Sequence, residues 1–93
     1  MAVAGKLSLE VITPQGVAVR EEVDSVVAPG VEGYLEVLPG HTTFLSALQV
    51  GQLSYVKDGQ ERFFRVGEGV LEVLEDRVLV LVESADPIEN SGL

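Results

Sequence analysis

Apolar and polar residues alternate along much of the chain, and this alternation predicts β-strands. In residues 7–11 every second position is apolar, which places Leu7, Leu9 and Val11 on one face of a half-buried strand. Residues 17–20 and 23–28 carry the same β-branched signal, and the intervening Thr-Pro-Gln-Gly at residues 13–16 is typical of a turn. No segment shows a long apolar pattern at helical spacing.

The second half of the chain predicts a hairpin followed by two more strands. Asp58-Gly59 marks the hairpin bend, and residues 70–74 and 78–83 form strands joined by a polar bend at residues 75–77. Residues 78–82 are apolar without interruption, which predicts a strand covered on both faces or one that crosses the centre of a sandwich, and in either case we expect Leu79 and Leu81 in the core. Short strands between glycine-rich turns indicate an all-β sandwich or flattened barrel.

The last ten residues, 84–93, lose the alternating pattern, and Pro87 disfavours a helix there. We therefore expect them to form a frayed tail. A chain of 93 residues suffices for one modest hydrophobic core. The expected organisation is a single β-sandwich domain over residues 1–86 and a flexible tail over residues 87–93.

Composition narrows the range of partners. Fifteen acidic residues against six basic ones give a net charge of -9, which opposes binding to nucleic acid or anionic lipid. Cysteine is absent, so neither a disulfide nor a thiolate metal site is possible. No apolar run approaches the roughly 18 residues of a membrane span. We expect a soluble protein without a nucleic-acid partner, still able to dock on a membrane-bound one.

Candidate catalytic chemistry is sparse. His41 is the only histidine, so the sequence suggests neither a histidine metal cluster nor a hydrolytic triad. Gly67-Glu68-Gly69 resembles a phosphate-binding loop, but a strand follows it where such a loop needs a helix, so we interpret it as a strand connection. We predict a protein that is not an enzyme and that has no cofactor and no metal.

Two charged features leave alternatives open. Lys57 near the hairpin bend could be a carrier lysine, although its neighbours Val56 and Asp58 do not match the tripeptides of biotinyl or lipoyl carriers. A small sandwich that binds a ligand or carries a prosthetic group, on Lys57 or Lys6, is the alternative function. The charged residues 20–22 and Asp24 predict a solvated strand edge that discourages pairing with other chains, or else a surface for a basic partner.

Residues 30–48, GVEGYLEVLPGHTTFLSAL, hold three of the ten glycines and the only histidine. Glycines permit backbone conformations and close approaches that a Cβ obstructs. Large apolar residues, among them Tyr34 and Leu38, stand between these glycines. This combination favours a docking surface over a reaction site.

The same segment resembles the signature of the epsilon subunit of F-type ATP synthases, called delta in mitochondria, in which a glycine-rich loop runs into Leu-Pro-Gly-His. Residues 7–30 and 63–85 are similar to the opening and closing strands of that family, so the resemblance covers residues 6–86. It implies a ten-stranded β-sandwich and a non-catalytic rotor subunit in the central stalk of a proton-translocating synthase. Such a subunit is peripheral to the cytoplasmic face of the bacterial membrane. It joins the gamma subunit to the c ring and couples ion-driven rotation to ATP synthesis.

The resemblance also implies which residues meet each partner. Pro39, His41 and Thr42 would lie toward gamma, and the loop of Glu32, Gly33 and Tyr34 would reach the c ring. Two positions depart from the family pattern: Glu36 stands where many relatives have glycine, and Thr42-Thr43 replaces Ala-Pro. Relatives usually continue into an inhibitory helical hairpin, which binds ATP in some bacteria. Since this chain ends at Leu93, the expected fold is the sandwich without the hairpin and without ATP binding.

Overall fold

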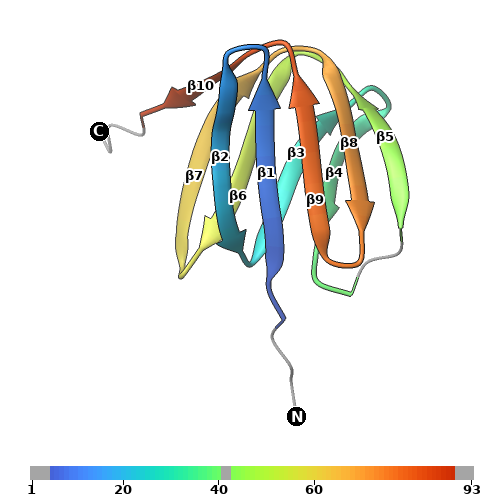
Figure 1. Ribbon diagram of the computed structural model, residues 1–93, viewed down its shortest axis with the longest axis vertical. Helices are drawn as coiled ribbons and strands as arrows, with labels where there is room; N and C mark the ends of the chain where they lie inside the picture. The colour runs from blue at the N-terminus through green and yellow to red at the C-terminus, as the bar shows by residue number, and fades with distance from the viewer. Residues whose placement is uncertain (1–4, 41–42, 90–93) are drawn as a thin grey trace.

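The computed structural model describes residues 5–40 and 43–89, and within them the chain forms ten strands and no helix (Figure 1). The strands are β1 (Leu7–Thr13), β2 (Gly16–Val23), β3 (Ser25–Gly30), β4 (Gly33–Val37), β5 (Phe44–Leu48), β6 (Gly51–Lys57), β7 (Gln60–Val66), β8 (Gly69–Leu74), β9 (Arg77–Val82) and β10 (Ala85–Ile88). The expected all-β, ten-stranded fold is therefore confirmed.

The strands form two layers. One layer has the order β10-β7-β6-β3-β4 and the other the order β5-β8-β9-β1-β2. A single residue pair, Gly30 with Leu48, joins β3 to β5 and makes the two layers one continuous hydrogen-bonded sheet. Strands β1 and β9 are parallel, whereas the other pairs of strands are antiparallel. The second layer is the one in which β2, β1, β9 and β8 run side by side in Figure 1.

The core lies between the layers and is built mainly from valine and leucine. Leu7, Leu9 and Val11 are fully buried, which confirms the half-buried strand that their alternation predicts. Strand β9 corrects another expectation. Val78, Val80 and Val82 face the core, but Leu79 is half-buried and Leu81 is 42% exposed. No other strand of the described chain covers the outer face of this layer, so an uninterrupted apolar run here has one buried face only.

The predicted bends are confirmed where the backbone turns left-handed. Asp58 and Gly59 have φ values of 51° and 80°, and they join β6 to β7. A two-residue hairpin loop with positive φ at both positions matches the twist of its strands. Glu75 and Asp76, with φ values of 49° and 63°, join β8 to β9 in the same way.

The C-terminal segment corrects the expected frayed tail. Residues Ala85–Ile88 form β10, an edge strand whose backbone pairs with β7 from Val66 to Phe63. Proline is tolerated on an edge strand, where one side of the backbone has no partner. β10 gains its conformation from this ladder, which the pattern of its own four residues does not reveal. It also runs across the domain boundary placed after residue 86.

Candidate interaction surfaces

A tight turn between β3 and β4 carries the first predicted site. Val31 and Glu32 connect the two strands, and Glu32, Gly33 and Tyr34 are all exposed. Gly33 has a φ of 129°, a conformation that L-residues rarely adopt. The structure thus presents a carboxylate at the tip of a hairpin turn whose shape depends on glycine.

The base of this turn is the corner where the hydrogen-bonded sheet passes from one layer to the other, through the pairing of Gly30 with Leu48. A Cβ on Gly30 would lie 2.7 Å from the carbonyl oxygen of Gly33, so the close crossing requires glycine. Pro29 has no N–H group, and the residue pairs between β3 and β6 end at Val27 with Ser54. Strand β3 nevertheless continues through Pro29 and Gly30, because these residues still pair with β4. It ends two residues beyond Ala28, where the sequence predicts its end.

Tyr34 supports this corner on the outer side. Its hydroxyl oxygen accepts a hydrogen bond of 3.2 Å from the backbone N–H of Gln52 on β6. Since Tyr34 pairs with Pro29 on β3, its side chain reaches across β3 to make this bond. The ring remains available to a partner because the residue is 60% exposed.

The second predicted site lies at the other end of β4. Strand β4 rises about 3.3 Å per residue, which separates Gly33 from Val37 by roughly 13 Å. Pro39 follows β4 and is half-buried. His41 and Thr42 lie outside the described residues. The fold therefore holds the Glu32 turn and Pro39 apart, at opposite ends of one strand.

Glu36, which stands where the resemblance implies glycine in many relatives, lies in a regular part of β4. It pairs with Val27 in the regular antiparallel ladder and has no positive φ. Its side chain is exposed on the outer face of the first layer. A residue other than glycine is therefore compatible with this backbone.

The outer face of the second layer carries an apolar surface that the sequence pattern does not predict. One side chain from each of five adjacent strands forms what we call the apolar row: Ala47, Val70, Leu81, Ile12 and Val17, in the order β5, β8, β9, β1, β2. All five are exposed or half-buried. The apolar row adjoins the Glu32 turn, because the N–H of Val31 donates to the carbonyl oxygen of Ala47 at 3.0 Å. The pattern within any one strand does not predict this row, because the five residues are aligned only by the register between neighbouring strands.

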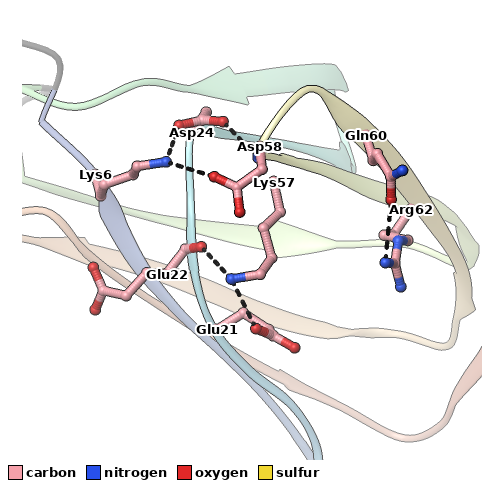
Figure 2. Close-up of polar contacts among 8 residues, drawn as sticks. All are labelled: Lys6, Glu21, Glu22, Asp24, Lys57, Asp58, Gln60 and Arg62. Atoms are coloured by element: carbon pink, nitrogen blue, oxygen red, sulfur yellow. Dashed lines mark hydrogen bonds and ion pairs between the residues drawn. The ribbon is translucent and has the colours of Figure 1, made fainter.

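The charged residues near β2 form ion pairs within the chain (Figure 2). Lys6 contacts Asp24 at 2.7 Å and Asp58 at 3.4 Å, and Lys57 contacts Glu21 at 3.3 Å. The hydrogen bond from Lys6 lowers the pKa of Asp24 and raises the pKa of Lys6. Strand β2 is the edge of its layer, as the solvated-edge interpretation expects. The carboxylates of Glu21 and Asp24 already have lysine partners, which disfavours the alternative of a surface for a basic protein.

The same contacts bear on the carrier alternative. Lys57 is the last residue of β6 and not the tip of the bend, and its amine is held by Glu21. Lys6 is held by two aspartates. A lysine that receives a prosthetic group must instead be free to react. Gly67 and Glu68 connect β7 directly to β8, which confirms the strand connection expected there.

The part of the chain that the structure describes contains no group of three or more metal-ligating side chains placed to hold an ion. Nor does it contain a helix of the length and apolar character needed to cross a membrane. The remaining features are surfaces: an exposed turn, a second turn beyond β4 and the apolar row.

A sandwich with exposed turns and an apolar row on one outer face defines an interaction module. Residues 6–88 match the family model described as ATP synthase, Delta/Epsilon chain, beta-sandwich domain. The chain belongs to this family.

Curated relatives agree with the family assignment. The ATP synthase epsilon chain of Thermodesulfovibrio yellowstonii is 55% identical over 85 residues, which are 91% of this chain and 61% of the relative. The ATP synthase epsilon chain 2 of Syntrophotalea carbinolica is 51% identical over 90 residues, which are 97% of this chain and 65% of the relative. The chain thus spans just under two thirds of the length of these relatives.

Solved structures share the fold. A chain of the Euglena gracilis mitochondrial ATP synthase, from a structure of OSCP, F1 and c-ring, matches with a TM-score of 0.85 and 19% identity over 99% of this chain and 61% of that one. A chain of the Tetrahymena thermophila mitochondrial ATP synthase, from a structure of the central stalk and c-ring, matches with a TM-score of 0.75 and 15% identity over 90% of this chain and 68% of that one.

Proposed function

We propose that this chain is the β-sandwich of a non-catalytic central-stalk subunit in a proton-translocating F-type ATP synthase. It links the gamma subunit to the c ring and thereby couples ion-driven rotation to ATP synthesis. The observation that carries the proposal is the match of residues 6–88 to the delta/epsilon sandwich family. Its place is peripheral, on the cytoplasmic face of a bacterial plasma membrane, where the complex holds it.

The two ends of β4 suit two different partners. The Glu32 turn, with Gly33 and Tyr34, is proposed to contact the c ring, and Pro39 with His41 and Thr42 is proposed to contact gamma. The roughly 13 Å along β4 separates the Glu32 turn from the start of the Pro39 segment. A subunit that transmits rotation must hold both partners together, so this separation fits mechanical coupling.

The apolar row is proposed as a second part of the gamma surface, at the end of the second layer that adjoins the Glu32 turn. An exposed apolar surface of this kind is typical of a protein interface, because its burial removes it from water. β5 begins next to the Pro39 segment and contributes Leu45, 69% exposed, to the same outer face. We therefore propose that gamma packs on the outer face of the second layer.

Binding experiments test both contacts. Leu81→Asp should weaken binding to purified gamma about tenfold or more, because it places a charge in an apolar interface. Ile88→Asp is the matched control, since Ile88 is 38% exposed but lies on β10 at an edge of the other layer. Equal weakening by both variants, or by neither, would contradict the gamma surface.

The c-ring contact is tested with Glu32→Lys and with Glu61→Lys as a control of equal charge change on β7. Purified c ring in detergent should retain wild type and Glu61→Lys in the presence of gamma, and it should lose Glu32→Lys. In a synthase depleted of its epsilon subunit, wild type should restore ATP-driven proton pumping. If wild type neither binds gamma nor restores pumping, the proposed function is wrong.

A further inference from the structure

Three segments far apart in the sequence meet at one residue of the β8–β9 bend. The Oδ1 atom of Asp76 accepts a hydrogen bond of 2.8 Å from the backbone N–H of Gly40, in the connection after β4. The carbonyl oxygen of Asp76 accepts a second bond of 2.9 Å from the N–H of Ser8 on β1. Asp76 therefore ties the Pro39-Gly40 turn to the rigid body of the second layer.

The backbone around Gly40 explains why such a tie matters. Pro39 fixes its own φ through its ring, whereas glycine is the residue with the most conformational freedom. Gly40 has a φ of 83°, in the left-handed region. The freedom of this turn therefore lies at Gly40, whose N–H is the group that Asp76 holds.

Pro39 also lies near Gly5: a Cβ built on Gly5, which has none, would be 3.4 Å from the Cβ of Pro39. A carboxylate that accepts from a backbone N–H makes one of the stronger kinds of hydrogen bond in proteins. The side chain of Asp76 is thus the main described polar restraint on Gly40.

We propose that Asp76 is a positioning residue for partner binding: its carboxylate fixes the Pro39-Gly40 turn in the conformation that gamma recognises. The proposal rests on the proposed function, because it takes this turn as part of the gamma surface. A turn that is already ordered loses less conformational entropy on binding, so the complex is tighter. Asp76 itself need not touch gamma.

The bend offers variants that separate positioning from stability. Asp76→Ala removes the acceptor but leaves the backbone bond to Ser8 in place. Asp76→Asn keeps an oxygen acceptor and removes the charge. Glu75→Ala is the matched control, because Glu75 is exposed, carries the same charge and has a similar φ of 49° in the same bend. Its side chain makes no hydrogen bond to another described residue.

Two measurements on the whole chain test the proposal. Amide hydrogen exchange at Gly40 should accelerate most in Asp76→Ala, less in Asp76→Asn, whose neutral acceptor makes a weaker bond, and stay near the wild-type rate in Glu75→Ala. Calorimetric titration with purified gamma should show affinity about tenfold lower for Asp76→Ala, a smaller loss for Asp76→Asn, and affinity within about twofold of wild type for Glu75→Ala.

The outcomes distinguish this inference from the proposed function. If wild type and Asp76→Ala bind gamma equally, the positioning role is overturned and the gamma surface stands. Equal losses in Asp76→Ala and Glu75→Ala, with unchanged exchange at Gly40, would also overturn it. If wild type does not bind gamma, the proposed function fails, and the positioning role fails with it.

Discussion

Truncating two leucines on opposite faces of the second layer should separate stability from binding. Leu71 on β8 is fully buried between the layers, whereas Leu81 on β9 is 42% exposed on the outer face. Leu71→Ala removes three buried carbons, worth roughly 2.4 kcal/mol of transfer free energy at about 0.8 each. The cavity left behind raises the expected loss of unfolding free energy to about 2.5–5 kcal/mol. Leu81→Ala leaves no enclosed cavity, and the wild-type Leu81 side chain is only a little more than half buried. We therefore expect a loss of unfolding free energy of about 1 kcal/mol.

Thermal and urea unfolding, followed by circular dichroism, measure both losses. The midpoint should fall by about 10 °C or more for Leu71→Ala and by about 5 °C for Leu81→Ala, since 1 kcal/mol shifts a domain of this size by about 4–8 °C. Affinity for gamma should change in the opposite order. Leu81→Ala should bind gamma more weakly than wild type, and the folded fraction of Leu71→Ala should bind it as wild type does. A loss of unfolding free energy below about 1 kcal/mol for Leu71→Ala, or above about 2 kcal/mol for Leu81→Ala, would refute the assignment of the two faces.

Three further predictions concern the corner and the ion pairs. Gly30→Ala should destabilise the fold by about 1–3 kcal/mol, because its Cβ would meet the Gly33 carbonyl oxygen at 2.7 Å, and chemical denaturation measures the loss. Tyr34→Phe should cost about 0.5–1.5 kcal/mol, since Gln52 loses the acceptor of its N–H; a cost near zero in the same assay would mean that water replaces the hydroxyl. Asp24→Asn should lower stability at neutral pH. Lys6 holds the pKa of Asp24 below its usual value of 3.8, so the ionised pair stabilises the fold at pH values above 3.8. The difference in unfolding free energy between Asp24→Asn and wild type should vanish as the pH falls through the lowered pKa. Urea titrations from pH 7 to pH 2 test this, and a difference independent of pH would contradict it.

The sequence determines the elements whose signal is local. The alternation at Leu7, Leu9 and Val11 specifies which face of β1 is buried, because side chains of a strand point to opposite faces in turn. Asp58-Gly59 specifies a hairpin, because few other residue pairs accept positive φ at two successive positions. The segment of residues 30–48 was sufficient to indicate the family to which the chain belongs.

Only the tertiary structure decides what depends on partners distant in the sequence. β10 is a strand because β7 offers it a free edge, and Leu81 is exposed because no other described strand covers the outer face of its layer. The apolar row exists because the register of five strands brings Ala47, Val70, Leu81, Ile12 and Val17 into line. Asp76 holds Gly40 across 36 positions of sequence. A sequence pattern records the preference of each segment, whereas register and layer packing are properties of the whole chain.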